Sequence, residues 1–305
     1  MHTTKQFRTT GHAEMDNGKI VILGGKGMLG TDLTNLCRSK GLNLVSLDLP
    51  EFDITNAGHL QNALKEAGLV INCAAYTNVE KAESEKDRAF KVNADAVGRL
   101  GEQAKKNGLW VLHISTDFVF DGTKKEPYNE QDQPNPINAY GQSKLAGEKL
   151  LIESGCQYCI IRLQWTYGLN GRNFVKKLIS AAKEKSELKV VDDQVGSPTS
   201  TEEAAKALVR LIQLKPTGVF HFASDGFTSR FGTAEFIFEK LAMPVRLKAC
   251  KTKDFPSAAA RPLNSTFDCS RIKGLLDEPI EEWQKPLERF IGKLKDKIKK
   301  SKIKS

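Results

Sequence analysis

Short apolar runs alternate with longer amphipathic segments along the first half of the chain. The runs Lys19–Leu23 (KIVIL) and Leu69–Cys73 (LVINC) are rich in β-branched residues, as buried strands are. The segment Met28–Lys40 spaces its apolar residues three and four positions apart, which is typical of a helix with one buried face. This alternation predicts a parallel sheet covered by helices.

The same pattern continues to residue 165 and then loosens. Strands are expected at residues 19–23, 43–47, 69–73, 109–114 and 158–163. Helices are expected at residues 28–40, 57–67, 80–107 and 138–153, the third of them ended by Asn107-Gly108. Further on, the pattern predicts helices at 173–185, 201–214 and 231–241 and strands at 219–222 and 245–249, which indicates a smaller second lobe.

The composition is that of a globular protein, with 40% hydrophobic and 27% charged residues among 305. No apolar run approaches the roughly 18 residues of a membrane span, and the polar N-terminus lacks the apolar stretch of a secretory signal. We therefore expect a cytoplasmic protein with no membrane partner. Six cysteines are too few for a disulfide scaffold, and the lone pair Cys156 and Cys159 lacks the two further ligands of a zinc site. Reduced thiols and no metal are expected.

The net charge of +9 is concentrated at the C-terminus, where residues 293–305 carry seven lysines and one aspartate. A basic face on the body of the protein would indicate nucleic-acid binding. A lysine-rich end is more typical of a solvated helix terminus. We therefore expect no specific nucleic-acid partner, and we expect removal of this segment to leave folding largely intact.

The first stretch with chemical meaning is Gly24-Gly25-Lys26-Gly27-Met28-Leu29-Gly30, between the first strand and the first helix. Glycines there allow a tight turn and bring a pyrophosphate close to the helix N-terminus. Asp48 ends the second strand, where a carboxylate can bond an adenosine ribose. Together they predict a dinucleotide site, and the alternative is a purely structural turn.

Tyr140 and Lys144 lie four residues apart on an expected helix and so on one face. A cation beside a phenol stabilises the phenolate and lowers its pKa, which suits proton transfer. Ser115-Thr116-Asp117 ends the fourth strand, at the sheet edge where ligands of open α/β folds bind. A hydroxyl there can bond a substrate oxygen or simply cap a turn. His113 and His221, within apolar strands, are expected to be hydrogen-bonded core residues.

In this order and on these elements, the three stretches resemble the extended short-chain dehydrogenase/reductase family. Residues 19–275 are similar to its dTDP-4-dehydrorhamnose reductase branch. The similarity is carried by residues 72–83 (NCAAYTNVEKAE), 115–122 (STDFVFDG), 140–148 (YGQSKLAGE), 193–199 (DQVGSPT) and 260–265 (ARPLNS). The resemblance implies an α/β fold, a Rossmann-type doubly wound parallel sheet with a smaller C-terminal substrate-binding lobe.

Four parts of the chain are then expected. They are a flexible arm at 1–18, a dinucleotide-binding domain at 19–165, a mainly substrate-binding lobe at 166–292 with some segments returning to the first domain, and a basic tail at 293–305.

The resemblance also implies a reaction, in which NADH or NADPH reduces the 4-keto group of a dTDP-linked 6-deoxyhexose to give dTDP-L-rhamnose. Tyr140 would donate the proton, assisted by Lys144 and Thr116. The nucleotide-sugar substrate would contact Thr116, Asp117, Trp165 and Arg261. Cofactor contacts are implied for Gly24, Gly27, Met28, Leu29, Gly30, Asp48, Asp53, Ile54, Ala75, Tyr76, Thr77, Tyr140 and Lys144.

The choice of cofactor depends on whether a cation lies near Asp48. Leu49, Pro50 and Glu51 follow it, so no arginine or lysine is at hand in sequence to receive a 2′-phosphate. Arg38, near the end of the first helix, is the alternative cation. We expect a preference for NADH without exclusion of NADPH.

Two departures from the family pattern leave the identity of the substrate's sugar undetermined. Leu163-Gln164 precede Trp165 where the family has Thr-Ser, and Arg230 follows Ser229 where a tryptophan is common. The alternatives are a nucleotide-sugar 4-epimerase, a reductase forming another 6-deoxysugar, and a non-catalytic cofactor-binding regulatory subunit. A homodimer and a Mg²⁺ ion are also left open.

Overall fold

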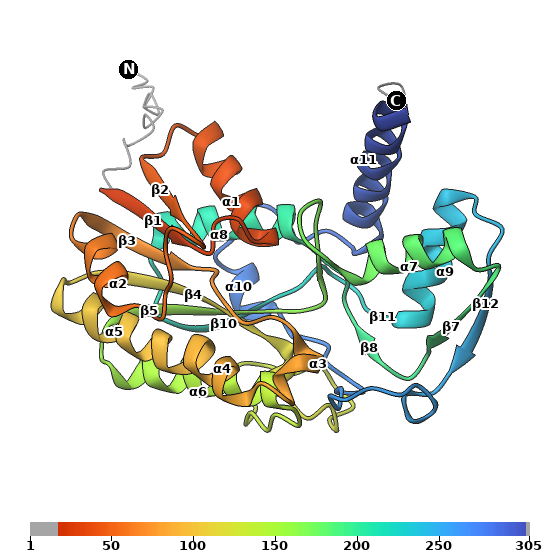
Figure 1. Cartoon of the computed structure of the whole chain (residues 1–305), viewed down its shortest axis with the longest axis horizontal. Helices are drawn as coiled ribbons and strands as arrows, with labels where there is room; N and C mark the ends of the chain where they lie inside the picture. Colours follow the sequence, from red (N-terminus) through yellow and green to blue (C-terminus); the bar gives the residue numbers. More distant parts are fainter. Residues whose placement is uncertain (1–17, 303–305) are drawn as a thin grey trace, which may run out of the picture.

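The computed structural model describes residues 18–302, and the side chains up to residue 296. The arm expected at residues 1–18 lies outside the described residues except for Gly18. Six strands form one sheet, parallel throughout, in the order β10-β5-β4-β3-β1-β2 (Figure 1). They are β1 Lys19–Leu23, β2 Leu44–Leu47, β3 Ala67–Asn72, β4 Trp110–Thr116, β5 Gln157–Leu163 and β10 Gly218–Phe222. The expected Rossmann-type sheet is confirmed.

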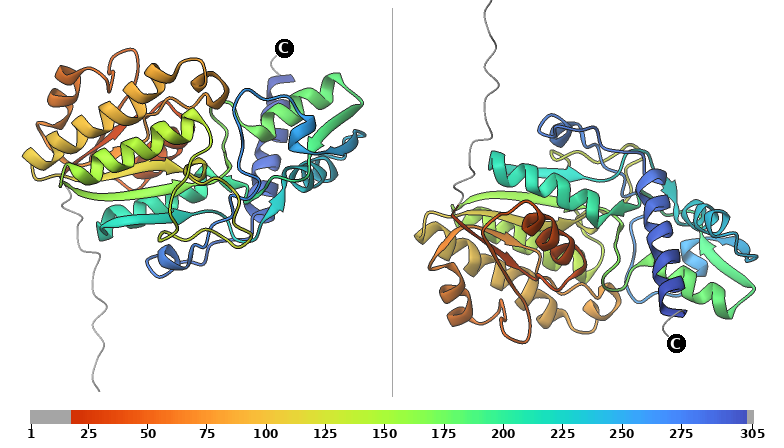
Figure 2. Two further views of the ribbon diagram at one scale, coloured as in Figure 1. Left: turned by 90° about the horizontal axis from the view of Figure 1, so that it is seen from below. Right: turned by 90° about the horizontal axis from the view of Figure 1, so that it is seen from above.

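Helices cover both faces of this sheet (Figure 2). On one face lie α1 Met28–Ser39 and α8 Thr201–Leu214, and on the other α2 Ala57–Leu64, α5 Ala96–Lys106 and α6 Ala139–Glu153. Alternate residues of β1 supply the two cores, because successive strand side chains point to opposite faces. Ile20 and Ile22 pack in the core with α1 and α8, and Val21 and Leu23 pack in the core with α2 and α5.

The single helix predicted over residues 80–107 is interrupted at residues 83–85, and the rest of it is helical through residue 106. The structure has α3 Val79–Ala82, α4 Lys86–Phe90, a π-helical turn Lys91–Asp95, and then α5. The turn contains Asn93, which is fully buried and whose side chain bonds the loop that precedes α3. A π-helical turn in a helix often accompanies a functional site, and here it brings an amide to the loop after β3.

The smaller lobe has its own core (Figure 1). It comprises α7 Phe174–Glu184, α9 Arg230–Leu241, α11 Gln284–Lys302 and the parallel pair β7 Glu187–Val191 and β12 Arg246–Cys250. Although they lie in the second half of the sequence, α8, β10 and α10 Ser270–Lys273 pack in the core of the larger body. Short pairs join the parts: β6 Thr166–Tyr167 with β9 Thr199–Ser200, and β8 Val195–Gly196 with β11 Thr228–Ser229.

Residues 293–302 of the lysine-rich segment are the second half of α11 rather than a separate element. Leu294 packs against the core of the smaller lobe, and Lys293 pairs with Glu202 of α8 at 2.5 Å. Within the described residues, no helix is both long enough and apolar enough to cross a membrane.

Candidate active site

The glycine loop between β1 and α1 has no room for side chains. Gly24 has φ +76°, and a Cβ built there would lie 2.5 Å from the nitrogen of Ala74. A Cβ at Gly30 would lie 2.1 Å from the carbonyl oxygen of Gly24. The N-terminus of α1 at Gly27 has no side-chain cap, whereas an asparagine caps α2 and another caps α6. A close backbone turn with uncapped N–H donors fits the pyrophosphate of a dinucleotide.

Asp48 lies beside this loop, as predicted. Its two carboxylate oxygens accept hydrogen bonds of 2.7 Å from the backbone N–H groups of Lys26 and Leu49. The Lys26 side chain donates to the Leu49 carbonyl at 2.7 Å and pairs with Glu51 at 2.8 Å. A cation therefore lies next to Asp48, and sequence reasoning missed it because it considered the residues that follow the aspartate and Arg38, but not the glycine loop.

Arg38 is not placed to be the alternative cation for a ribose 2′-phosphate. It lies in the last turn of α1, ten residues beyond Met28. At about 1.5 Å per residue, this places it roughly 15 Å along the helix from the glycine loop. Arg38 and the glycine loop therefore lie at opposite ends of α1.

The loop after β3 holds Ala75, Tyr76 and Thr77. Tyr76 donates its N–H to Asn93 Oδ1 at 2.8 Å and accepts from Asn93 Nδ2 at 3.1 Å. Asn93 also bonds the Ser143 hydroxyl of α6 at 2.9 Å. Sequence reasoning missed Asn93, although a polar residue on the apolar face of an expected helix was a usable signal.

The other residues implied for the cofactor lie after β2. Asp53 accepts bonds of 2.8 Å from the backbone and hydroxyl of Thr55, and these bonds lower the pKa of its carboxyl. Ile54 is buried in the core beneath this turn.

Thr116 and Tyr140 meet where β4 ends against α6. The Thr116 hydroxyl lies close enough to Tyr140 to lower the pKa of its phenol, and it donates to Asp117 Oδ1 at 3.1 Å. Burial raises the pKa of Tyr140 to about 12, the Asp117 charge adds to the rise, and the Thr116 bond opposes it. The pKa of Tyr140 is thus raised by burial rather than lowered, as was expected from a neighbouring Lys144. Tyr140 keeps its proton at neutral pH, as a proton donor must.

Lys144 lies one turn further along α6 and is only 2% exposed. Its ammonium nitrogen Nζ donates to the Ile114 carbonyl at 2.7 Å and lies 3.3 Å from His113 Nε2. Burial lowers the pKa of Lys144 to about 8, while Glu148 and Cys73 oppose the fall. His113 is a hydrogen-bonded core histidine, as expected.

A buried ion pair holds α6 in place and was not foreseen. Glu148 binds Arg162 of β5 through contacts of 3.0 and 2.6 Å, and both side chains are at most 5% exposed. Ser115 donates its hydroxyl to Glu148, so this member of the Ser115-Thr116-Asp117 stretch faces the helix. His221 lies 3.3 Å from Arg162 and 3.0 Å from the Tyr128 carbonyl, which confirms it as a hydrogen-bonded core residue.

Asp117 and Trp165 meet an unforeseen arginine from the smaller lobe. Arg230 lies over the Trp165 ring, 3.4 Å from its centroid, and 4.8 Å from the centroid of Phe174. Burial lowers the pKa of Arg230 to about 9, opposed by the charge of Asp117. Burial raises the pKa of Asp117 to about 6, opposed by its hydrogen bonds and by Arg230. Asp117 Oδ2 is buried with no hydrogen-bond partner among the described residues.

Gln164, a departure from the family pattern, and Arg261, a predicted substrate contact, both bond other residues of the chain. Gln164 bonds Ser265 and accepts the N–H of Ser197 at 2.7 Å, so it joins the two later segments that carry the resemblance. Arg261 pairs with Glu80 of α3, and its charge also acts on Arg230.

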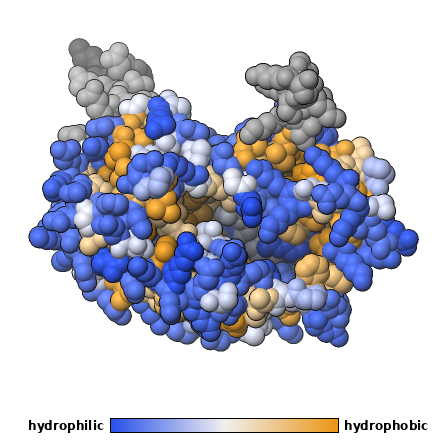
Figure 3. Space-filling model, in the orientation of Figure 1, coloured by the Kyte–Doolittle hydropathy of each residue, from blue (hydrophilic) through white to orange (hydrophobic). Residues whose placement is uncertain are grey.

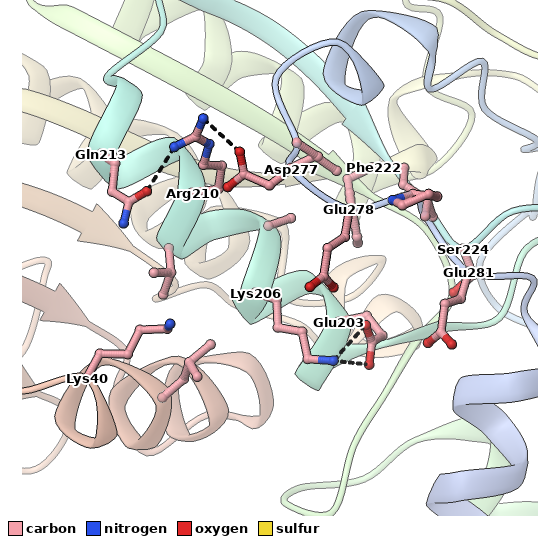
Figure 4. A pocket seen from close by; sticks show the side chains of 16 residues that line it. Lys40, Glu203, Lys206, Arg210, Gln213, Phe222, Ser224, Asp277, Glu278 and Glu281 are labelled. Carbon is pink, nitrogen blue, oxygen red and sulfur yellow. Dashed lines mark hydrogen bonds and ion pairs between the residues drawn. The ribbon is translucent and has the colours of Figure 1, made fainter. Parts of the chain in front are cut away.

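The surface is hollowed between the larger body and the smaller lobe (Figure 3). A separate pocket of about 420 Å³ lies between α1, α8 and residues 276–281. Four of its charges form two ion pairs, Arg210 with Asp277 and Lys206 with Glu203 (Figure 4), and no predicted site residue lines it. In the part of the chain that the structure describes, no three His, Cys, Asp or Glu side chains gather as a metal site would require.

A parallel Rossmann-type sheet, a glycine loop opening its first helix, and a Thr116, Tyr140 and Lys144 set at the same edge define an extended short-chain dehydrogenase/reductase. Comparison with known proteins narrows the class. The family model described as "RmlD substrate binding domain" matches residues 18–296, and the chain belongs to that family.

Its relatives carry the name dTDP-4-dehydrorhamnose reductase. One from Sinorhizobium fredii is 32% identical over 289 residues, covering 90% of this chain and 97% of that protein. A crystal structure of the enzyme from Clostridium acetobutylicum superimposes with a TM-score of 0.87 at 38% identity, covering 91% of this chain and 99% of the other. One from Bacillus anthracis, in complex with NADP, has a TM-score of 0.87 at 36% identity and covers 90% and 99%.

Proposed function

We propose that this protein reduces the 4-keto group of dTDP-4-dehydrorhamnose to give dTDP-L-rhamnose, with NADPH or NADH as reductant. The proposal is carried by one observation, the grouping of Thr116, Tyr140 and the buried Lys144 at the edge of the sheet where the glycine loop lies. The names of the relatives and the NADP complex of one of them support it.

In this proposal Tyr140 is the general acid. When bound, NAD(P)H supplies a hydride to C4 of the sugar. Tyr140 gives its hydroxyl proton to the oxygen that becomes negative, and Thr116 hydrogen bonds to the same oxygen. Lys144 binds the ribose next to the nicotinamide. A tyrosine whose pKa is about 12 is protonated before the reaction and is still far more acidic than an alcohol, so the transfer is downhill.

The substrate contacts belong to the same proposal. Asp117 Oδ2, buried and unpaired among the described residues, can accept a sugar hydroxyl, and Trp165 supplies an apolar face. Arg230, stacked on Trp165, supplies a cation near the sugar or its diphosphate. Arg261 is engaged with Glu80, and it would reach the substrate only by leaving that carboxylate.

The cofactor contacts follow the glycine loop. Gly24, Gly27, Met28, Leu29 and Gly30 would hold the pyrophosphate. Asp48 would bond the adenosine ribose. The turn of Asp53 and Ile54 and the loop of Ala75, Tyr76 and Thr77 would line the adenine and nicotinamide halves. A cytoplasmic location and action as a homodimer are also proposals.

The test is to incubate the purified protein with dTDP-4-dehydrorhamnose and NADPH or NADH and to identify the sugar by NMR. We expect dTDP-L-rhamnose and one reduced cofactor consumed per product. An epimerase would instead purify with NAD bound, leave added NAD(P)H unconsumed with this ketone, and invert C4 of a nucleotide-linked sugar that carries a C4 hydroxyl, such as dTDP-L-rhamnose. Cofactor binding without turnover would identify a regulatory subunit.

A further inference from the structure

A line of buried polar side chains lies behind Lys144. Asn72 ends β3, His113 is in the adjacent strand β4, and Lys144 is on α6, each at most 2% exposed. Asn72 Nδ2 lies 3.1 Å from His113 Nδ1, and His113 Nε2 lies 3.3 Å from Lys144 Nζ. The three side chains therefore form one connected path from the sheet to the lysine.

A backbone group fixes the direction of this path. The N–H of Ala74 donates to Asn72 Oδ1 at 3.0 Å, so the Asn72 amide presents its Nδ2 donor to the imidazole. His113 Nδ1 must accept, and a neutral imidazole then carries its one hydrogen on Nε2. Burial and the charge of Lys144 hold the pKa of His113 well below its usual range, which removes the doubly protonated form.

The Nε2–H of His113 consequently points at Lys144 Nζ. An uncharged amine can accept this hydrogen with its lone pair, whereas an ammonium would set one donor against another. The Ile114 carbonyl, 2.7 Å from Nζ, can accept from either form. The contacts from β4 therefore match the amine better than the ammonium.

The remaining charged or titratable groups that act on Lys144 favour the ammonium. They are Glu148 on α6 and Cys73 in the loop after β3. Glu148 is already bound to Arg162 and Ser115, and burial of Lys144 acts in the opposite direction. These groups act in opposite directions, and the hydrogen on His113 Nε2 adds to the side of the amine.

We propose that His113, held in its Nε2–H tautomer by Asn72, is a positioning residue that disfavours the ammonium form of Lys144. The result is a lysine that gains and loses a proton near neutral pH. This inference rests on the proposed function only in assuming that Lys144 takes part in the reaction. The tautomer and the titration are properties of the protein without substrate.

The tautomer is measured first, in the native protein labelled with ¹⁵N-histidine. NMR shifts of the ring nitrogens distinguish a protonated Nε2 from a protonated Nδ1, and His113→Phe identifies the signal by its loss. We expect His113 with its hydrogen on Nε2 between about pH 6 and 9. A hydrogen on Nδ1 would overturn the proposal without any variant having to fold.

The titration of Lys144 is measured next, with ¹³Cε-lysine labelling and Lys144→Arg for assignment. Asn72→Asp can still accept the Ala74 N–H, but its second oxygen takes a hydrogen from His113 Nδ1. The Nε2 lone pair then faces the ammonium, and we expect the Lys144 midpoint to rise by at least about one pH unit. Asn62→Asp, the same change on the exposed face of α2, is the control and should leave it in place.

The negative charge that Asn72→Asp adds could act alone, and a double variant separates the two effects. In a His113→Phe background, Asn72→Asp should shift the Lys144 midpoint clearly less than in the native background. Equal shifts would overturn the role of the tautomer. If the protein reduces its substrate as proposed, the lysine-dependent limb of its kcat profile should move upward in Asn72→Asp. Absence of turnover would contradict the proposed function and leave the NMR result standing.

Discussion

The guanidinium of Arg230 lies 3.4 Å from the ring centroid of Trp165. The arginine comes from α9 of the smaller lobe, and the tryptophan follows β5 of the sheet. Trp165 has a left-handed backbone, with φ +42°, so its ring is held by the turn rather than by a strand. The stack is therefore a contact between the two lobes, beside the buried carboxylate of Asp117.

Replacing Arg230 tests whether this stack serves the substrate. In Arg230→Leu we expect KM for the nucleotide sugar to rise about tenfold or more with a smaller change in kcat, because a buried cation near a diphosphate or sugar oxygen contributes at least about one to two kcal/mol. Steady-state kinetics measure it. Arg246→Leu, an exposed arginine of β12, is the control, and an unchanged KM in Arg230→Leu would remove the arginine from the substrate site.

Tyr140→Phe should reduce kcat roughly 100-fold or more while cofactor affinity stays near normal, because it deletes the proton donor and little binding surface. Single-turnover kinetics and fluorescence titration with NADPH measure the two effects. Tyr158→Phe, a change of the same size in β5, should alter neither. Near-normal turnover in Tyr140→Phe would contradict the mechanism.

Cofactor selection should depend on Lys26 and not on Arg38. Lys26 Nζ lies at the Asp48 to Glu51 turn, where a ribose 2′-phosphate would replace Glu51 as its partner. We expect Lys26→Ala to lower kcat/KM for NADPH about tenfold relative to NADH, and Arg38→Ala to leave the ratio unchanged. The ratio of the two efficiencies decides it, and a shift caused by Arg38→Ala alone would reverse the assignment.

Asp117 should make the stability of the protein depend on pH. Its pKa is raised in the folded protein from the usual 3.8 to about 6, so the favourable contribution is complete below about pH 4 and is lost as the pH rises through 6. A shift of this size corresponds to about 3 kcal/mol. The free energy of unfolding of Asp117→Asn, relative to native protein, should therefore increase by about that amount between about pH 4 and 7.

Urea unfolding across this pH range measures the effect of Asp117. Asp268→Asn is a contrast of opposite sign, since bonds from Ser270 lower the pKa of Asp268, and its contribution is lost as pH falls. If the difference in free energy of unfolding between Asp117→Asn and the native protein did not depend on pH, burial would not raise the pKa of Asp117.

The lysine-rich end should be dispensable only in part. Removal of residues 293–305 deletes the Leu294 packing and the pairing of Lys293 with Glu202, and we expect Tm to fall by about 2–4 °C. Removal of residues 297–305 alone should leave Tm unchanged. This revises the expectation from the sequence that the whole segment can be lost freely. A Tm equal to that of the full-length protein for the truncation at residue 293 would restore it.

The sequence by itself determined the succession of strands and helices along the chain and the ends of most helices, because apolar periodicity and turn residues act locally. It also located the glycine loop and the face shared by Tyr140 and Lys144, since a fixed spacing on a helix becomes a fixed position.

Tertiary structure decided which distant residues meet. Asn93 bonds Tyr76 from a π-helical turn, Lys26 turns toward Glu51, Arg230 crosses to Trp165, and His113 comes against Lys144. Each contact joins segments whose separation is set by how helices and strands pack. The charge and hydrogen-bond state of a buried group depend on those contacts more than on its neighbours in sequence.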